Sequence, residues 1–477
     1  MKMLIGGKHA DASDGKTQVV LNPATQEILD SVPVATKEDV ELVLQHAVAG
    51  ARAWAGVPLY QRISILKKFH MLFMQGRDEL WQLLQRETGK TFGAATGCID
   101  GSIELAEHYI ELARGYGGET FPNENRASTQ GDILFTVREP LGVIVCFLPF
   151  NFPIDSYMHK VIPALLMGNA VIIKPASDTP LTDIRVTELL WEAGVPGEAV
   201  QLITGSGSKV GSWLTTDPRV ALVNLTGSTA VGVEIAKNSA QYLHRLHLEL
   251  GGNDALVILE DADLDQAVDA AFNSRIGNAG QVCCAGKRFI VHNGLKEAFG
   301  NALVKKLCAV KMGDPADPTV ECGPLISIEA AKLLEQQVEH SVQQGAKILY
   351  GGKRIKDAYY TPTAIEITPD ADVATNLELF GPVWSIIGYD TVEQALEIAN
   401  NTIYGLSSGV IGKDLKTMMR VAASLKAGCC VVNGSGAYRS SDQPFGGYKM
   451  SGLGREGGRY TLEELSQVKT IVLKNVL

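Results

Sequence analysis

The chain has 477 residues, which is enough for two or three domains. Apolar residues make up 45% of it and the formal net charge is −10, so a large core is feasible and nucleic acid or an anionic membrane is disfavoured as the main partner. No apolar run approaches the roughly 18 residues that span a bilayer, and the N-terminus lacks the apolar stretch of a signal peptide, so we expect a cytoplasmic location.

The first part of the chain predicts short strands followed by helices. Residues 1–35 have the short runs and turns of small strands. Thr36 is a candidate N-cap, because acidic residues in the next turn favour a helix, which we expect to end near Trp54. Helical periodicity continues over 61–86 and 103–116, and we expect these helices to pack around a sheet.

From residue 141 onward, strands and helices alternate. Alternation predicts parallel strands joined by crossover helices, an open α/β sheet whose ligands bind at the carboxyl ends of its strands. The strand candidates are Gly142–Phe147, Ala170–Lys174, Ala199–Ile203 and Val220–Leu225, with helices at Tyr157–Met167, Thr182–Ala193 and Lys209–Thr215. A second α/β unit is expected from strand Ala255–Leu259, with helices at Leu264–Arg275, Phe299–Lys311, Ile328–Gln344 and Val392–Asn400.

Two adjacent cysteines, Cys283 and Cys284, follow Gly280-Gln281-Val282 at a junction between a helix-like and a strand-like segment. A cysteine at such a junction can face a cleft, although free cysteine is also among the most buried residue types. The eight cysteines of the chain show no Cys-x-x-Cys spacing, and adjacent pairs suit zinc poorly, so we predict no disulfide framework and no metal site.

Two other motifs carry side chains that suit acyl chemistry. Glu249 lies in an apolar run before two glycines, where a partly buried carboxyl with a raised pKa could act as a general base. An ordinary strand would instead place this Glu on a solvated face. Asn151 stands between Pro149 and Pro153; its rigid amide could donate to an oxyanion, and the plainer interpretation is a proline-rich turn.

Together these motifs resemble the aldehyde dehydrogenase superfamily, in which an Asn before a Pro, a Glu-Leu-Gly-Gly segment and a Gly-Gln-x-Cys segment occur in this order. The resemblance extends from Asn22-Pro23 to Ser451-Gly452, nearly the whole chain. It implies NAD(P)-dependent oxidation of an aldehyde to its carboxylic acid, through a thiohemiacetal and a thioester on a cysteine.

The resemblance also assigns roles to individual residues. Cys283 is the expected nucleophile, because it is the first cysteine after Gln-Val. Glu249 is expected to activate water and Asn151 to donate to the oxyanion. Lys160 matches a family lysine and is expected to assist a proton relay.

A nicotinamide cofactor site is implied as well. Its expected contacts are Lys174 at the adenosine ribose, Gly227 and Ser228 at the pyrophosphate, and Glu378 and Phe380 at the nicotinamide end. The plainer interpretations are a surface lysine, a simple helix cap, and a turn Glu beside a core Phe. A glycine-rich stretch at 205–211 resembles a dinucleotide fingerprint but has one residue too many.

Ser177 bears on the choice between NAD and NADP. Many NAD-preferring relatives carry Glu three residues after the lysine, and a carboxylate there would repel a 2′-phosphate. Ser177 occupies this position, so we expect the chain to accept NADP as well as NAD.

His159 and Arg439 are the candidate substrate contacts. An Arg and a His at the mouth of a cleft would suit a small aldehyde with an anionic or hydroxylated tail, as in the semialdehyde and lactaldehyde dehydrogenase branch. Succinate-semialdehyde relatives often have Arg where this chain has His159, which is a departure from that pattern. The alternative for Arg439 is a solvated loop charge.

The resemblance implies a fold of three parts. We expect a Rossmann-like cofactor domain with an open parallel sheet (1–117 and 138–248), a second α/β catalytic domain (249–460) and a small β oligomerisation hairpin (118–137 and 461–477). A homodimer or homotetramer would follow. The alternatives are a surface hairpin of a monomer and a last strand that is an edge within one chain.

Two rival functions remain open. A CoA-acylating dehydrogenase of the same fold would replace water by CoA, and Glu249 argues against it because a water-activating base would then be less necessary. A non-catalytic protein that retains the fold is the other rival, and the joint presence of Cys283, Glu249 and Asn151 argues against it.

Overall fold

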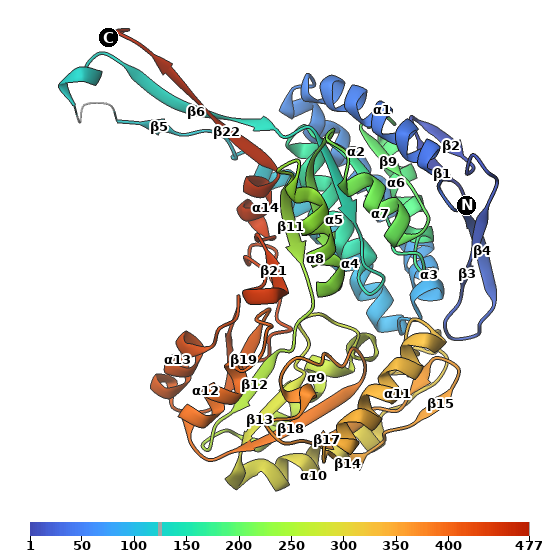
Figure 1. Ribbon diagram of the computed structural model, residues 1–477, viewed down its shortest axis with the longest axis vertical. Helices are drawn as coiled ribbons and strands as arrows, with labels where there is room; N and C mark the ends of the chain where they lie inside the picture. Colours follow the sequence, from blue (N-terminus) through green and yellow to red (C-terminus); the bar gives the residue numbers. More distant parts are fainter. Residues whose placement is uncertain (123–125, 477) are drawn as a thin grey trace.

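The structure, a computed structural model, describes residues 1–122 and 126–476. Residues 123–125 and 477 belong to the expected oligomerisation segment, and that part of the prediction lies outside the described residues. Figure 1 shows two α/β lobes and a long arm that leaves the first lobe beside the C-terminus. The chain is therefore a mixed α/β protein, as the alternating pattern predicts.

The first lobe is built on an eight-stranded sheet with the order β2-β1-β9-β8-β7-β10-β11-β21. Its strands are β1 (Met3–Ile5), β2 (Lys8–Ala10), β7 (Val143–Phe147), β8 (Ala170–Lys174), β9 (Val200–Leu202), β10 (Val220–Thr226), β11 (Arg245–Glu249) and β21 (Gly452–Leu453), and a separate hairpin pairs β3 (Thr17–Leu21) with β4 (Ile28–Pro33). The strands from β9 to β11 run parallel. Strand order reverses between β7 and β10, which is where open α/β sheets bind ligands.

Helices cover both faces of this sheet. They are α1 (Lys37–Ala55), α2 (Leu59–Gln75), α3 (Arg77–Thr88), α4 (Phe92–Ala113), α5 (Pro153–Leu166), α6 (Leu181–Ala193), α7 (Gly207–Thr215), α8 (Thr229–Ala240) and α14 (Gly458–Glu464). In β7, Ile144 and Cys146 pack into the core beside α5 and α6, whereas Val143 and Val145 pack into the core beside α1 and α7. Because successive side chains point to opposite faces, a wholly apolar strand serves both cores.

The second lobe holds a seven-stranded sheet with the order β14-β17-β18-β13-β12-β19-β20. Its strands are β12 (Ala255–Ile258), β13 (Arg288–His292), β14 (Lys347–Tyr350), β17 (Thr363–Glu366), β18 (Val383–Tyr389), β19 (Ser408–Ile411) and β20 (Val431–Val432), with a small hairpin of β15 (Arg354–Lys356) and β16 (Tyr359–Tyr360). Its helices are α9 (Leu264–Ile276), α10 (Asn293–Ala309), α11 (Ile328–Gln343), α12 (Val392–Asn400) and α13 (Leu415–Ser424). The expected second α/β unit is confirmed.

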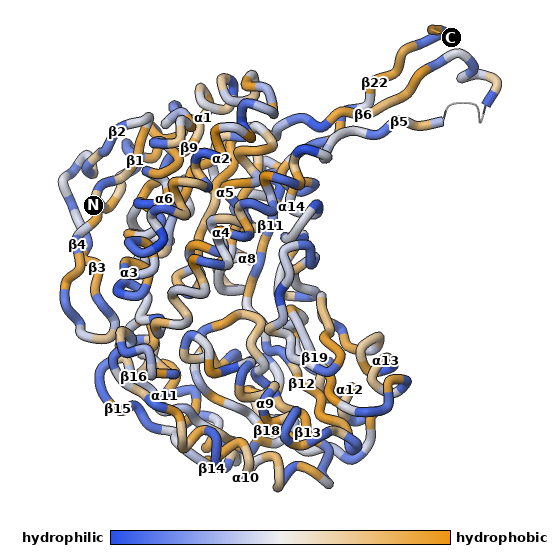
Figure 2. The backbone as a smooth tube through the Cα atoms, turned by 180° about the vertical axis from the view of Figure 1, so that it is seen from behind, coloured by the Kyte–Doolittle hydropathy of each residue, from blue (hydrophilic) through white to orange (hydrophobic). Residues whose placement is uncertain are grey.

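The arm is a three-stranded sheet of β5 (Thr120–Phe121), β6 (Ile133–Pro140) and β22 (Ser466–Leu473). β22 pairs antiparallel with β6 along its whole length, so the last strand lies at the edge of a sheet within its own chain. Seen from behind in Figure 2, the three strands leave the body together and carry hydrophobic stretches far from either core.

The predicted N-cap of α1 holds, and two helix predictions need correction, because the helix expected over 103–116 begins at Phe92 and the run expected over 61–86 is divided. Thr36 caps α1, accepting from the Asp39 N–H, while the Asp39 side chain accepts from the Thr36 N–H. The helical run expected over 61–86 is two helices, because Gly76 ends α2 and begins α3, and a glycine lowers helix propensity. Among the described helices, none has the length and apolar character needed to cross a membrane.

Candidate active site

A cleft of about 600 Å³ brings distant parts of the sequence together. Its lining includes five of the residues expected at the site, namely Asn151, His159, Glu249, Cys283 and Arg439. They come from the segment after β7, from α5, from the end of β11, from the loop after α9 and from the loop before residue 445. The cleft therefore unites side chains from both lobes.

The loop that carries the cysteines has a constrained backbone. Asn278 and Ala279 both have φ of 51°, a left-handed conformation that non-glycine residues seldom adopt. Gly280 has φ of +74°, and a Cβ there would lie 2.2 Å from the Gly381 carbonyl oxygen. Gln281 fixes the loop, because its Nε2 donates to the Asn278 carbonyl at 3.0 Å and its Oε1 accepts from the Ile326 N–H at 2.9 Å.

The two cysteines differ in exposure. Cys283 is half-buried and lines the cleft, whereas the whole of Cys284 is only 4% exposed. Their side chains are hydrogen-bonded to each other, so they titrate as a pair. The pKa for losing the first proton of the pair is lowered, because the remaining thiol donates to the thiolate and Arg439 adds positive charge nearby.

Asn151 is locked to the cysteine loop. Its Nδ2 donates to the Gln281 carbonyl at 3.0 Å, and its own carbonyl accepts from Asn278 Nδ2 at 3.2 Å. An amide nitrogen carries two hydrogens, so one remains for a group in the cleft. The geometry suits an oxyanion donor, which must be rigid before the charge develops.

Glu249 ends β11 and is only 3% exposed. Its side chain is hydrogen-bonded to Cys283, and within the described residues its Oε1 has no hydrogen-bond partner. Burial, and then the charge of Glu456, raise its pKa to about 8. A carboxyl in this state lies beside the nucleophile and can exchange a proton near neutral pH.

Lys160 reaches the site through a residue that the sequence analysis missed. Its fully buried Nζ lies 3.2 Å from Glu456 Oε2. Burial opposes ionisation of Glu456, yet the charges of Lys160, His159 and His247 lower its pKa to about 2. Glu456 precedes two glycines, as Glu249 nearly does, and this repeated pattern was the available signal.

His159 and Arg439 both line the cleft, but the His159 ring is held by a hydrogen bond whereas Arg439 is exposed. His159 Nδ1 is hydrogen-bonded to the Tyr109 hydroxyl at 2.8 Å, and burial lowers the pKa of its ring. Arg439 is exposed to the cleft solvent, and its guanidinium lies 3.4 Å from the centroid of the Phe445 ring. The Arg439 Nη1 donates to the Tyr438 carbonyl, which leaves other donors free for a ligand.

A second cavity, of about 250 Å³, opens at the carboxyl ends of β7, β8 and β10. Lys174 lines it, with its Nζ donating to the Pro175 carbonyl at 2.8 Å, and burial lowers the pKa of Lys174 to about 8. Gly207 and Ser208, from the stretch dismissed as an imperfect fingerprint, also line it. Ser177 does not; its hydroxyl donates to the Gly205 carbonyl at 3.4 Å.

The other expected cofactor contacts lie near strand ends and are absent from the lining of both cavities. Gly227 donates its N–H to the Glu249 carbonyl at 3.0 Å, and Ser228 caps α8 by accepting from the Val231 N–H. Glu378 Oε1 accepts from the Gly252 N–H at 3.3 Å.

Phe380 packs edge-on against Phe150, with ring centroids 5.9 Å apart. Lys174 thus supplies a cation, Ser228 marks the N-terminus of α8, Glu378 supplies a carboxylate and Phe380 an aromatic face. These groups fit a nicotinamide dinucleotide.

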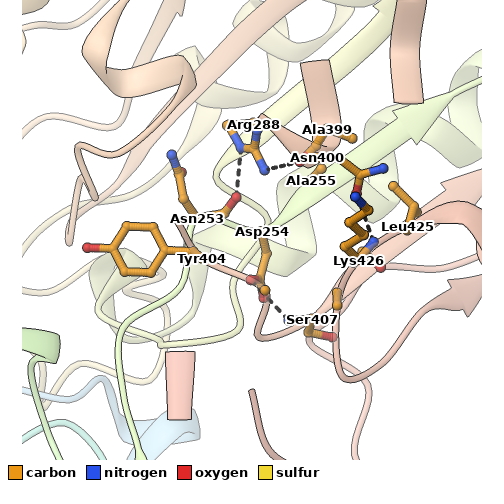
Figure 3. Close-up of a pocket in the computed structure, with 13 residues that line it drawn as sticks. Asn253, Asp254, Ala255, Arg288, Ala399, Asn400, Tyr404, Ser407, Leu425 and Lys426 are labelled. Carbon is orange, nitrogen blue, oxygen red and sulfur yellow. Dashed lines mark hydrogen bonds between the residues drawn. The ribbon is translucent and has the colours of Figure 1, made fainter. Parts of the chain in front are cut away.

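A different polar cluster supports the site without binding anything large. Asn253, Asp254 and Arg288 are among the residues that line the pocket drawn in Figure 3. Its volume is about 10 Å³, which is too small for a substrate. Arg288 donates to the Asn253 carbonyl at 2.7 Å and to three other backbone carbonyls. It thereby anchors the segment after Gly252. Within the described residues, no group of three or more His, Cys, Asp and Glu side chains could hold a metal ion.

Comparison with solved structures gives close matches over the full length. An NADP-dependent enzyme of E. coli is 32% identical, with a TM-score of 0.95 over 99% of this chain and 98% of that one. Betaine aldehyde dehydrogenase from Staphylococcus aureus, in complex with NAD⁺, is 33% identical, with a TM-score of 0.95 over 100% of this chain and 94% of that one. An aldehyde dehydrogenase from Brucella melitensis biovar abortus is 34% identical, with a TM-score of 0.95 over 99% of this chain and 97% of that one.

A family model agrees with these matches. The model of the aldehyde dehydrogenase family covers residues 9–471, which includes both lobes and most of the arm. The motif order, the parallel sheet and the cleft with its cysteine all point the same way, and the chain belongs to the aldehyde dehydrogenase family.

Proposed function

We propose that this NAD(P)-dependent aldehyde dehydrogenase uses Cys283, Glu249 and Asn151 to oxidise a small aldehyde with an anionic or hydroxylated tail to its carboxylic acid. The observation that carries the assignment is the contact between a half-buried thiol and a buried carboxyl with a raised pKa in one cleft. Covalent acyl chemistry needs that pair, because one group attacks the carbonyl and the other later activates water.

The nucleophilic step begins at Cys283, whose side chain is hydrogen-bonded to that of Cys284. A thiolate is the reactive form of cysteine. The hydrogen bond with Cys284, burial and the charge of Glu249 raise the pKa of Cys283. The positive charge of Arg439 acts in the opposite direction, toward the thiolate. Cys283 attacks the aldehyde carbon, and the oxygen gains negative charge next to the Asn151 amide and the Cys283 N–H. Bound at the strand ends, the nicotinamide ring would accept the hydride that leaves the substrate carbon and so complete the oxidation to a thioester.

Hydrolysis of the thioester is the task of Glu249. The carboxylate takes a proton from water, which then attacks the acyl carbon and releases the acid from Cys283. Glu456 and Lys160 form a buried ion pair whose two charges act on Glu249, and Lys160 is proposed to assist the relay of the proton that Glu249 takes up.

Arg439 supports the proposed substrate class. It is the only Lys or Arg in the lining of the cleft, as far as the described residues show. The carboxyls of Asp155 and Glu104 also line the cleft, and their negative charge would act against an anionic substrate. Burial raises the pKa of Asp155, which favours its neutral form, and its side chain accepts hydrogen bonds from Cys98 and Ser102. A short tail with one carboxylate or hydroxyl would match one guanidinium beside several hydrogen-bonding groups.

A panel of aldehydes tests the proposal. Succinate semialdehyde, lactaldehyde, betaine aldehyde and propanal are assayed with NAD and with NADP, each without CoA. We expect acid formation without CoA and the highest kcat/KM for one of the first two aldehydes. Product only in the presence of CoA would support the acylating alternative, and no reduction of either cofactor would support a non-catalytic protein.

Arg439→Ala tests the substrate class separately. A hydrogen bond to a charged group contributes about 1.5–3 kcal/mol, so kcat/KM for an anionic aldehyde should fall by about 10- to 150-fold, with little change for propanal. Arg420→Ala is the matched control, because Arg420 is exposed and paired with Glu393 on the second lobe. Equal losses on both substrates would remove Arg439 from substrate recognition.

We also propose that the arm of β5, β6 and β22 is the oligomerisation segment of a cytoplasmic homodimer or homotetramer. The proposed cofactor domain comprises residues 1–117 and 138–248, and the proposed catalytic domain comprises residues 249–460. Support comes from Val468, Val472 and Leu473, which are exposed on β22 although they are apolar. Light scattering of the full chain and of a Val468→Lys variant tests this, and a monomer in both cases would oppose it.

A further inference from the structure

Lys287 is a buried cation with no assigned role. It follows the cysteine loop directly, and its side chain is only 2% exposed. Its Nζ lies 3.1 Å from Glu378 Oε1, donates to the Val282 carbonyl at 3.2 Å and also donates to the Cys283 carbonyl. A buried ammonium is costly unless its three donors are satisfied, and here three acceptors satisfy them.

The contact with Val282 fixes the direction of a functional N–H. The peptide bond is planar and trans, so the Val282 carbonyl and the Cys283 N–H point to opposite sides of one plane. Because the carbonyl is turned toward Lys287, the Cys283 N–H is turned away from it. In the described chain this N–H has no protein acceptor, as expected for a donor reserved for an oxyanion.

The contact with Glu378 fixes the other side of the lysine. Glu378 Oε1 is shared between Lys287 and the Gly252 N–H. Its Oε2 lies over Gly251, where an added Cβ would come within 2.4 Å of it. The Lys287 ammonium and the Gly252 N–H therefore hold the same carboxylate oxygen, and the absence of a side chain at Gly251 leaves room for the other.

We propose that Lys287 is a positioning residue that joins the nucleophile loop to Glu378, so that cofactor binding and presentation of the Cys283 N–H depend on one buried ammonium. The inference rests on the proposed function, which assigns Glu378 to the cofactor and the Cys283 N–H to the oxyanion. A lysine that merely fills the core would need neither its charge nor its three contacts.

Binding of NADH and NADPH, followed by the enhancement of their fluorescence, tests the coupling without any aldehyde. Lys287→Met keeps the length of the side chain and removes the charge, and we expect the Kd to rise about 10-fold. Glu378→Gln should raise it similarly. If the two residues act as one unit, the double variant should also show a rise of about 10-fold and not about 100-fold.

Controls separate positioning from general stability. Lys296→Met removes the partly exposed ion pair with Glu366 and should leave the Kd unchanged. Lys287→Arg keeps the charge and should recover most of the affinity lost in Lys287→Met. In steady-state assays, Lys287→Met should raise the KM for the cofactor and lower kcat, and it should leave the KM for the aldehyde unchanged.

Three results would overturn the proposal. The first is an unchanged Kd in a folded Lys287→Met variant, and the second is a multiplicative loss in the double variant. The third applies if Lys287→Met fails to fold: then unchanged affinity in Glu378→Gln decides against it. If the enzyme oxidised none of the aldehydes in the panel, the proposed function would be refuted. The cofactor-binding measurements would still support or refute the positioning role of Lys287.

Discussion

Replacing Glu249 by Gln isolates the hydrolytic step. Gln keeps the shape of a protonated carboxyl, so Cys283 should still attack and the first turnover should still reduce the cofactor. Removing a general base costs about 10²- to 10⁴-fold in the step that it serves, which corresponds to about 2.7–5.5 kcal/mol. The thioester should therefore accumulate, because only its hydrolysis requires the carboxylate.

The pH dependence of the wild-type enzyme follows from the same environment. With a pKa of about 8, about one tenth of the Glu249 side chains are ionised at pH 7 and about nine tenths at pH 9. The hydrolytic rate should thus rise about 10-fold between these pH values. Glu249→Gln should lose this rise along with most of its steady-state rate.

Stopped-flow fluorescence of the reduced cofactor is the assay. Glu249→Gln should give a burst of about one equivalent per active site, followed by a slow steady state. Glu393→Gln, an exposed position on α12, is the matched control and should behave as wild type. A Glu249→Gln variant with a wild-type steady-state rate, or with no burst at all, would refute the assignment of Glu249 to hydrolysis.

Glu456→Gln tests why the pKa of Glu249 is raised. Removing the Glu456 charge takes away a like charge and leaves the buried Lys160 ammonium unpaired, and both changes favour ionised Glu249. The pH profile of hydrolysis should therefore move to lower pH than in the wild type. A shift to higher pH would show that another group sets the profile.

Four further substitutions test the cysteines, the oxyanion donor and the choice of cofactor. Cys283→Ala should abolish oxidation while Cys284→Ala largely preserves it, and comparable losses would contradict the choice of nucleophile. Asn151→Ala should lower kcat by about 10²- to 10³-fold, as loss of one oxyanion donor does, with the steady-state kcat as the measurement. Ser177→Glu should weaken NADP binding more than NAD binding. Because burial lowers the pKa of Lys174 to about 8, wild-type affinity for NADP should fall above that pH.

Much of the fold could be predicted because local patterns agree with the tertiary structure. The β8 bounds match the prediction, since Ala170–Lys174 is an apolar run that is buried on both faces and ends at a lysine. The break at Gly76 was missed because the apolar periodicity continues across it. The start of α4 at Phe92 was missed as well, since its first turns contain glycines that weaken the helical signal.

The site was predictable by residue type but not by environment. Asn151, Glu249 and Cys283 could be named from motifs, and the cleft unites them. The proposed roles of Glu456 and Lys287 depend on the Lys160–Glu456 contact, which spans 296 residues, and on the contact of Lys287 with the distant Glu378, which no local pattern records. Ser177 stays a predicted cofactor contact from its motif position, and the structure adds that its hydroxyl donates to the Gly205 carbonyl.

The charge states of two carboxyls favour water over CoA as the acyl acceptor. Glu456 is paired with Lys160 and stays ionised, whereas burial and the charge of Glu456 favour the protonated form of Glu249 at neutral pH. Two carboxyls whose pKa values are driven apart in one site mark separate roles in proton transfer. A CoA thiol enters as a nucleophile with an ionisable proton of its own, and it would not require a carboxyl beside Cys283 whose proton leaves near pH 8. The buried position of Glu249, which is costly to maintain, is explained if its carboxylate must meet a water molecule at the acyl carbon.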